Sequence, residues 1–224
     1  MPDPAFQPQI DSARYKIGKY LTLERFISYF HQITETVKLG VESVLEIGIG
    51  NGLVTACLRQ LGIRVTTCDF DASVRPDVVA DVRQIGLPDA SVDLVMACQV
   101  LEHLPFEDAD QALKELARIS KKYAIVSLPR RHMAFEAVLK FPGIRTIFKR
   151  HFLDLSVVIP LRFPGFAESG QHYWEIDQWT VSLAEVKRKM GKYFRINRVF
   201  SPPLNKYHVF FFSRSAYKMR GLPY

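Results

Sequence analysis

A glycine-rich loop between a short apolar run and an amphipathic segment constrains the fold of this chain more than any other feature. Ser43–Ile47 is short, apolar and partly β-branched, and it continues directly into Gly48-Ile-Gly50-Asn-Gly52. Such a run followed by glycines is typical of a buried strand, and residues 53–61 then show helical spacing. Glycine lets the backbone turn sharply and approach a ligand closely. The order of strand, glycine loop and helix predicts an open α/β sheet with a ligand site at the end of its first strand.

The same alternation continues through the middle of the chain. We expect a helix at residues 106–119 and further strands at residues 64–68, 77–80, 92–97 and 123–128. Strands alternating with helices indicate a mostly parallel, doubly wound sheet that is covered on both faces.

The two ends of the chain add elements of different kinds. Residues 22–37 have helical spacing, so residues 1–40 are expected to form an N-terminal helical segment. In the tail, Ser182 and Glu185 form a capping box ahead of a helix at Leu183–Met190. Strands at residues 194–200 and 207–213 follow, and their short link favours an antiparallel pair. We treat residues 1–224 as one domain.

The residues around the glycine loop narrow the choice of ligand. A dinucleotide loop carries a third glycine where this chain has Leu53. Glu46, directly before the loop, would repel a phosphate but attract the cationic amino group of a methionine moiety. Asp69 lies 21 residues (69 − 48) after Gly48, the distance at which an acidic side chain meets a ribose diol. Asp81 ends the third strand and could accept a hydrogen bond from an adenine amino group, or could be an ordinary cap or loop residue.

Together these stretches resemble the class I S-adenosylmethionine-dependent methyltransferases, most closely the small-molecule group that includes the ubiquinone-biosynthesis methyltransferases. The resemblance covers roughly residues 40–130, with a weaker echo at residues 172–190. It is carried by residues 44–52 (VLEIGIGNG), 65–69 (VTTCD), 79–81 (VAD) and 87–104 (LPDASVDLVMACQVLEHL).

The resemblance implies a seven-stranded Rossmann-like sheet with an antiparallel last strand, and S-adenosylmethionine as a cofactor that leaves as S-adenosylhomocysteine. Glu46 would face the methionine amino group, Asp69 the ribose hydroxyls, and Asp81 with the backbone of Val82 the adenine. The cofactor-binding residues that it implies are Glu46, Gly48, Gly50, Asn51, Asp69, Phe70, Asp81, Val82, Cys98 and Gln99. Only residues 70–76 separate Asp69 from the third strand, so the helix usual there is expected to shrink to a turn.

Methyl transfer needs a general base only where the acceptor must lose a proton. His103 and His172 are the candidate catalytic residues, because histidine titrates near neutrality. His103 could instead tie the fourth strand to the next helix, and His172 is equally open to a structural role. The Asn/Asp-Pro-Pro-Tyr/Phe loop of nitrogen-methylating enzymes is replaced by Ala97-Cys-Gln-Val100, so oxygen is the expected acceptor atom. No metal site is predicted.

An insertion at residues 130–176 is the least family-like part of the chain. Its first 37 residues, 130–166, hold seven lysines and arginines, two acidic residues and six phenylalanines, a net charge of +5 out of +7 for the whole chain. We expect a helical cap that packs on the sheet and closes over a small-molecule or lipid-linked, anionic acceptor. Peripheral contact with an anionic membrane is a further expectation. An RNA contact is the weakest reading, because bulky aromatics outnumber polar residues that could read bases.

Other features bound the class of protein. The three cysteines match no disulfide or zinc framework, which favours a reducing compartment. The N-terminus shows no apolar leader, and the longest apolar stretch is too short to span a membrane. We therefore predict a cytoplasmic enzyme, peripheral to the membrane if the insertion binds lipid. The alternatives are an RNA methyltransferase and a non-catalytic protein that binds S-adenosylmethionine.

Overall fold

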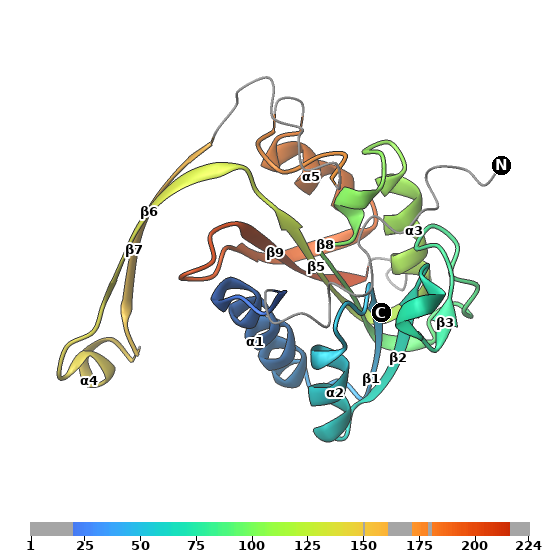
Figure 1. Cartoon of the computed structure of the whole chain (residues 1–224), viewed down its shortest axis with the longest axis horizontal. Coiled ribbons are helices and arrows are strands. Elements are labelled where there is room, and N and C mark those ends of the chain that lie inside the picture. The colour runs from blue at the N-terminus through green and yellow to red at the C-terminus, as the bar shows by residue number, and fades with distance from the viewer. Residues whose placement is uncertain (1–19, 150, 161–171, 179–180, 216–224) are drawn as a thin grey trace, which may run out of the picture.

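The computed structural model describes residues 20–149, 151–160, 172–178 and 181–215, and its centre is a seven-stranded sheet (Figure 1). The strand order is β3-β2-β1-β4-β5-β9-β8. The strands are β1 (Ser43–Ile47), β2 (Arg64–Asp69), β3 (Val78–Val79), β4 (Val92–Cys98), β5 (Ser120–Pro129), β8 (Phe194–Phe200) and β9 (His208–Ser215). The first five are parallel, and β9 runs antiparallel to both β5 and β8. The strand order reverses between β1 and β4, where open α/β sheets bind their ligands.

Helices cover both faces of this sheet, because alternate residues of each central strand are buried on opposite sides. In β1, Leu45 packs with the apolar side chains of α3 (Ala109–Ile119) and α5 (Leu183–Met190). Its neighbour Val44 packs with α1 (Leu23–Lys38) and α2 (Leu53–Gln60). The central strands are thus apolar on both sides, as a parallel sheet between helical layers requires.

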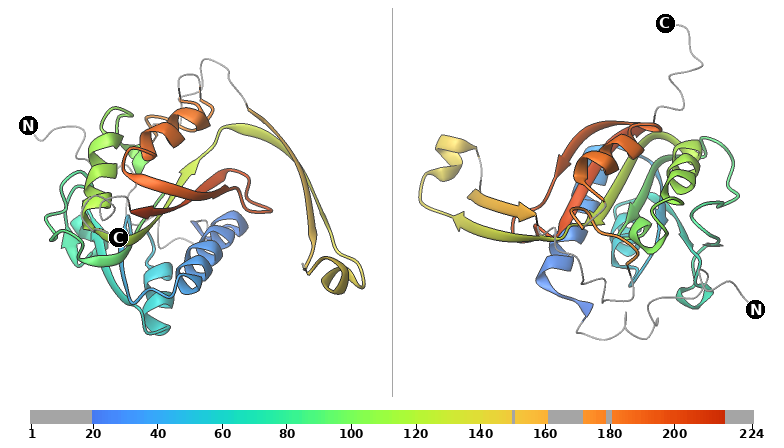
Figure 2. Two further views of the ribbon diagram at one scale, coloured as in Figure 1. Left: turned by 180° about the vertical axis from the view of Figure 1, so that it is seen from behind. Right: turned by 90° about the horizontal axis from the view of Figure 1, so that it is seen from above.

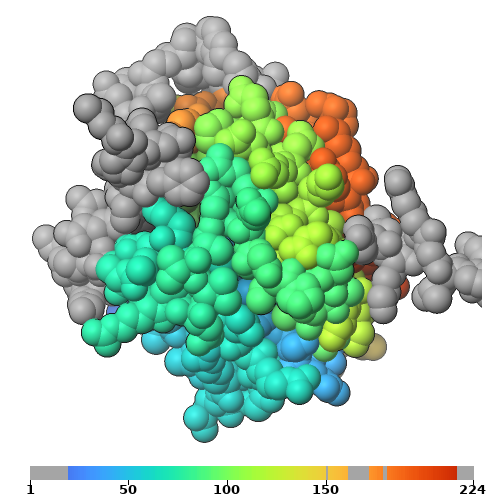
Figure 3. Space-filling view, turned by 90° about the vertical axis from the view of Figure 1, so that its right-hand side faces the viewer, coloured from blue at the N-terminus to red at the C-terminus, as the bar shows by residue number. Residues whose placement is uncertain are grey.

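The sheet, its helices and its tail confirm the expectations from the sequence. The segment between β2 and β3 is reduced to the single 3-10 turn Ala72–Val74, as expected. The Ser182 hydroxyl accepts a hydrogen bond from the Glu185 N–H at the start of α5. Figure 3 shows the side of the molecule opposite the insertion, where the chain from β2 to α3 forms a continuous surface. Residues 1–19 of the expected N-terminal segment lie outside the described residues.

The insertion after β5 is not the helical cap that we expected. It is a β-hairpin arm of β6 (His132–Leu139) and β7 (Leu153–Pro160), with one short helix, α4 (Ile144–Phe148), near its tip. The arm projects from the body, as Figures 1 and 2 show from three directions. Cross-strand pairing over eight residue pairs replaces the expected packing on the sheet. Residues 161–166 of the predicted cap lie outside the described residues.

One feature of α1 also departs from a simple amphipathic helix. Its buried side carries Ser28, Gln32 and Thr36, whereas Phe26 and Phe30 are exposed. The polar stripe faces the end of the sheet where β1 and β4 finish, and two of its side chains reach the site described below. Among the described residues, no helix is both long and apolar enough to cross a bilayer.

Candidate functional site

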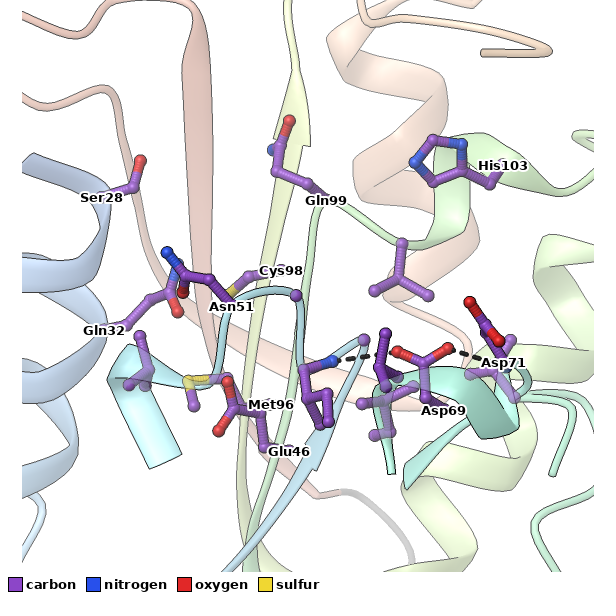
Figure 4. Close-up of a pocket in the computed structure, with 18 of the residues that line it drawn as sticks. Ser28, Gln32, Glu46, Asn51, Asp69, Asp71, Met96, Cys98, Gln99 and His103 are labelled. Carbon is purple, nitrogen blue, oxygen red and sulfur yellow. Dashed lines mark hydrogen bonds between the residues drawn. The ribbon is translucent and has the colours of Figure 1, made fainter. Parts of the chain in front are cut away.

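A pocket of about 380 Å³ opens at the carboxyl ends of β1, β2 and β4. All twelve residues singled out from the sequence line it, ten as cofactor-binding candidates and two as catalytic candidates. Figure 4 shows Ser28 and Gln32 of α1 on one side of the pocket and Asp69, Asp71 and His103 on the other. The structure therefore brings the predicted residues together, while the role of each one stays a prediction.

The glycine loop forms the part of the wall nearest β1. Gly48, Gly50 and Gly52 all have positive φ, at 76°, 53° and 73°, which side-chain-bearing residues rarely adopt. A Cβ added at Gly48 would lie 2.5 Å from Cγ2 of Val100, so the loop and the end of β4 approach as closely as glycine allows. The loop thus leaves a cradle with backbone on its surface, which suits close contact with a ligand.

Asp69, at the end of β2, is fixed against this loop. Its Oδ2 accepts a hydrogen bond from the Ile49 N–H at 3.1 Å, and its Oδ1 accepts one from the Asp71 N–H at 3.1 Å. Burial raises the pKa of the Asp69 carboxyl, and these backbone hydrogen bonds oppose that rise. The carboxylate is oriented before any ligand arrives, with acceptor capacity left for hydroxyl donors.

Glu46 lies buried on β1 beneath the loop. Its Oε2 accepts a hydrogen bond from the Thr55 hydroxyl of α2. Burial raises the pKa of the Glu46 carboxyl to about 7. A cationic group that entered the pocket beside Glu46 would favour the ionised carboxylate and bring this pKa down again. The residue is thus suited to an ammonium group and unsuited to a phosphate.

Asp81, the expected adenine contact, is engaged by its own neighbour. Arg83 donates from Nε and Nη2 to both carboxylate oxygens, at 2.6 to 3.0 Å, and its Nη1 reaches Asp108 at 2.6 Å. The Arg83 N–H also donates to Asp81 Oδ1 at 2.7 Å. The carboxylate therefore has little acceptor capacity left, and the adjacent backbone of Val82 is the better placed polar group on this wall.

The end of β4 closes the pocket on the side of α1. Gln99 has a positive φ of 59°, and its N–H donates to the Ser127 carbonyl at 2.9 Å. Burial raises the pKa of the neighbouring Cys98 thiol to about 12, so this thiol is protonated at neutral pH. These residues can contribute shape and backbone polar groups, but Cys98 does not offer a thiolate nucleophile.

Two histidines, His103 and His172, line one end of the pocket, and two carboxylates that do not line it, Glu102 and Glu175, lie beside them. The rings of His103 and His172 lie edge to face with centroids 5.0 Å apart. His172 Nδ1 is 2.8 Å from Glu175 Oε1, which also accepts a hydrogen bond from the Tyr207 hydroxyl at 2.9 Å. Burial would raise the pKa of Glu175, but the hydrogen bonds from His172 and Tyr207 lower it. Glu175 thus holds the imidazole of His172 by one nitrogen.

Glu102 completes this cluster and was not predicted from the sequence. Its side chain is fully buried, and neither carboxylate oxygen has a hydrogen-bond partner. Burial raises the pKa of Glu102 to about 8, so it is mostly protonated at neutral pH. One ligand atom each from Glu102, His103 and His172 lie within 4.8 Å of one another, close enough to ligate one metal ion. No spacing pattern signals this group in advance, because His172 is 69 residues (172 − 103) from His103.

Sequence reasoning also missed the residues that α1 and β9 contribute to the wall. Arg25, Ser28, Tyr29 and Gln32 come from α1, His208 is the first residue of β9, and Tyr207 directly precedes it. Ser28 Oγ is hydrogen-bonded to His208 Nδ1, and burial lowers the pKa of His208 to about 4. His208 is therefore neutral and locks α1 onto the sheet beside the pocket. The polar stripe on α1 was the one signal that could have pointed to these residues.

Residues 45–128, which include the glycine loop and the ends of β2 and β4, match the family model described as a methyltransferase domain. Over these residues the chain is similar to a methyltransferase domain. No curated protein matches the chain. Solved structures match it over most of its length.

Three of these structures illustrate the likeness. Magnesium protoporphyrin IX methyltransferase from Synechocystis PCC 6803, with bound S-adenosylhomocysteine, is 17% identical at a TM-score of 0.59, over 94% of this chain and 90% of that one. A SAM-dependent methyltransferase from Aquifex aeolicus is 16% identical at a TM-score of 0.56, over 92% of this chain and 100% of that one. The 1,6-didemethyltoxoflavin-N1-methyltransferase of Burkholderia thailandensis is 14% identical at a TM-score of 0.53, over 96% of this chain and 79% of that one.

At these identities the likeness to solved structures establishes the fold, and the predicted class I methyltransferase fold is confirmed. The matched domain and the neighbours together support an enzyme with S-adenosylmethionine as its cofactor. These similar structures do not identify the acceptor atom of this chain, since one of them is named for methylation at a nitrogen.

Proposed function

We propose that the chain transfers the methyl group of S-adenosylmethionine to an oxygen atom of a small-molecule or lipid- or carrier-linked acceptor. The single observation that carries this proposal is the meeting of two groups in one pocket. A glycine loop with Glu46 and Asp69 lines one end, and His103 and His172, the second of which is held by Glu175, line the other. The first group suits the cofactor, and the second supplies a proton acceptor beside it.

The cofactor end is assigned by the chemistry of its side chains. Glu46 would pair with the methionine amino group and Asp69 would accept hydrogen bonds from the ribose hydroxyls. Gly48, Gly50 and Asn51 would follow the ribose and methionine part, with Cys98 and Gln99 at the methionine end. Phe70, Asp81 and Val82 would border the adenine. When bound, the cofactor supplies an activated methyl on a sulfonium, so the protein's task is to bind, align and exclude water.

The acceptor end favours a group that must lose a proton. Glu175 holds Nδ1 of His172, which leaves Nε2 as the nitrogen that can take a proton from a hydroxyl. His103 stacks edge-on against His172 and limits its rotation. Glu102 is buried beside both, and burial raises its pKa to about 8, so Glu175 is the ionised carboxylate that pairs with this imidazole. A histidine that a carboxylate orients through one nitrogen can act as a general base through the other.

Calorimetry tests the cofactor half of this proposal. We expect S-adenosylmethionine and S-adenosylhomocysteine to bind in the micromolar range, roughly −8 kcal/mol. The intact, folded protein showing no affinity for either compound would reject the assignment of the pocket.

Transfer from methyl-labelled cofactor tests the acceptor half. Cell extract separated into lipid, small-molecule and RNA fractions would be incubated with the protein and with His172→Ala, which should bind cofactor but transfer slowly. Label in the lipid or small-molecule fraction supports the proposal. Label confined to RNA would favour the RNA alternative, and cofactor binding without any transfer would favour the non-catalytic one.

A further inference from the structure

The hairpin arm has one face made entirely of apolar side chains. Its register sets Met133, Phe135, Ala137 and Leu139 of β6 opposite Ile159, Val157, Leu155 and Leu153 of β7. Side chains alternate along a strand, so these eight residues share one face of the ribbon. The opposite face is mixed, because Glu136, Ser156 and Asp154 lie there beside Ala134, Val138 and Val158, so only one face of the ribbon is wholly apolar.

This face is open to solvent. Phe135 is 65% exposed and Val157, its cross-strand partner, is 60% exposed. A two-stranded ribbon is marginally stable by itself in water, and a contiguous exposed apolar patch on a soluble protein usually marks an interaction site. None of the described residues of the arm lines the pocket, so the face does not serve as a wall for the substrate.

The opposite face of the arm is tied to the body. Glu136 accepts hydrogen bonds from the Leu204 N–H at 2.8 and 3.0 Å. The Lys206 side chain is only 7% exposed, and its Nζ lies 2.6 Å from Asp154 and 3.3 Å from Glu136. The two acidic residues of the arm are thus neutralised on this face, near its middle. The apolar face is left pointing away from the contact with the β8–β9 connection.

The tip of the arm adds positive charge and no negative charge. The described residues of the tip, 140–149 and 151–152, contain Lys140, Arg145 and Lys149 but no aspartate or glutamate. Among them, Phe141, Ile147 and Phe148 are exposed, Ile147 by 68%. The two acidic residues of the arm, Glu136 and Asp154, are paired with Lys206, whereas the charged residues of the tip are all basic. The tip therefore complements a negatively charged surface.

We propose that this arm docks the protein on a membrane that contains anionic lipid, with the apolar face in the interface and the basic tip among the headgroups. Apolar side chains enter the boundary between headgroups and acyl chains, and lysine and arginine beside them are attracted to anionic lipid. A second copy of the chain would bury the same face but would leave the charge of the tip unexplained, because its own tip is equally basic. The inference rests on the arm and does not depend on the methyl acceptor.

Flotation of the full chain with vesicles tests this inference. We expect binding to phosphatidylcholine vesicles that contain phosphatidylglycerol, little binding to phosphatidylcholine alone, and loss of binding at high salt. Replacing three charges, Lys140→Gln, Arg145→Gln and Lys149→Gln together, should lower the partition coefficient by roughly 100-fold. The matched control, Lys114→Gln, Lys187→Gln and Arg188→Gln, removes the same charge from exposed positions on α3 and α5 and should change it little.

Two further variants separate the apolar face from the rest of the ribbon. Phe135→Ser with Val157→Ser, a facing pair on the apolar face, should weaken binding by at least tenfold. Ala134→Ser, on the opposite face, should not. Circular dichroism and cofactor affinity would establish that each variant is folded.

Three results would overturn the proposal. One is no binding of the wild-type chain to anionic vesicles at low salt, and another is equal loss of binding in the tip and control variants. The third is a stable dimer in solution that the Phe135→Ser, Val157→Ser pair abolishes, since a second copy would then cover the face.

Discussion

A hydrogen bond between Asp69 and Ile49 joins the end of β2 to the glycine loop that follows β1. The Ile49 N–H, between two glycines of positive φ, donates to Asp69 Oδ2 at 3.1 Å. The parallel pairing of β1 with β2 brings these residues together, since Ile47 and Cys68 lie side by side at the ends of the two strands. One carboxylate therefore shapes the glycine loop and also presents an acceptor to the pocket.

Replacing Asp69 should weaken cofactor binding by more than one interaction. Asp69→Ala removes the proposed acceptor for the ribose hydroxyls and also the anchor of the Ile49 N–H. We expect the dissociation constants of S-adenosylmethionine and S-adenosylhomocysteine to rise by roughly 10- to 100-fold, since hydrogen bonds to charged groups contribute about 1.5–3 kcal/mol. Calorimetry measures this, with Asp89→Ala, a carboxylate on the surface beside Arg118, as the control. Unchanged affinity in Asp69→Ala would remove Asp69 from the site.

Gly48 allows a test of the close approach between the loop and β4. Gly48→Ala places a methyl group where Val100 Cγ2 lies 2.5 Å away, whereas Gly62→Ala has a similar φ of +83° but nothing within 4 Å. Both should lose about 1–2 kcal/mol of stability from backbone strain. Only Gly48→Ala should also lose cofactor affinity, by at least tenfold, because the loop must move. Thermal unfolding measures the strain in both variants, and calorimetry measures the effect of the displaced loop on cofactor affinity. Equal cofactor affinities of Gly48→Ala and Gly62→Ala would contradict the assignment of the glycine loop to the cofactor site.

Glu46 should make cofactor affinity depend on pH. Burial raises the pKa of its carboxyl to about 7, and the proposed partner, an ammonium group, binds the ionised form. Below this pKa the carboxyl must release a proton on binding, so affinity should fall by up to about tenfold per pH unit from about pH 7 to 5.5. Glu46→Gln should bind more weakly and lose most of this dependence. Calorimetry in two buffers of different ionisation heat would detect the released proton, and a flat profile for the wild type would argue against the pairing.

The sheet and most of the cofactor end could be predicted from the sequence because their signals are local. Buried parallel strands appear as continuous apolar runs, and β1 is followed within one residue by its glycine loop. Residues at the carboxyl ends of neighbouring parallel strands meet at one edge, so Glu46, Asp69 and Gln99 could be placed together before the structure was known.

What the sequence could not predict depends on contacts between distant segments. Ser28 meets His208 across 180 positions, and nothing near either residue signals that contact. The arm was predicted to be a helical cap because its apolar residues were expected to pack on the sheet and its basic residues to face solvent. Pairing between β6 and β7 replaces that packing, and strand formation depends on such a distant partner more than on local propensity.

Lys206 should hold the arm in its observed place. Lys206→Gln leaves the carboxylates of Glu136 and Asp154 without their shared cation in a site that is largely shielded from water. We expect faster amide hydrogen exchange in β6 and β7 and little change in β1, β4 and β5, because the arm makes few other contacts with the body. Lys192→Gln, which removes an exposed lysine beside Asp110, is the control. Equal protection of the arm in both variants would mean that Leu204 alone secures it.

Glu102 should make the stability of the protein fall as pH rises. Burial raises the pKa of its carboxyl to about 8 in the folded state, against 4.5 as the ordinary value. Between these values the unfolded chain has released the proton and the folded chain has kept it, so the free energy of unfolding decreases with pH and levels off above about pH 8. Glu102→Gln keeps a neutral side chain of the same shape. It should match the wild type near pH 4.5 and exceed it above pH 8 by up to about 5 kcal/mol. Burial raises the pKa of Glu46 as well, and Glu46 is still present in the Glu102→Gln variant. Part of the decrease of the unfolding free energy with pH should therefore persist in that variant. It should be smaller still in the double variant that also carries Glu46→Gln. Urea unfolding across this range gives the comparison, and curves for wild type and Glu102→Gln that stay parallel at every pH would show that Glu102 is already ionised in the folded protein.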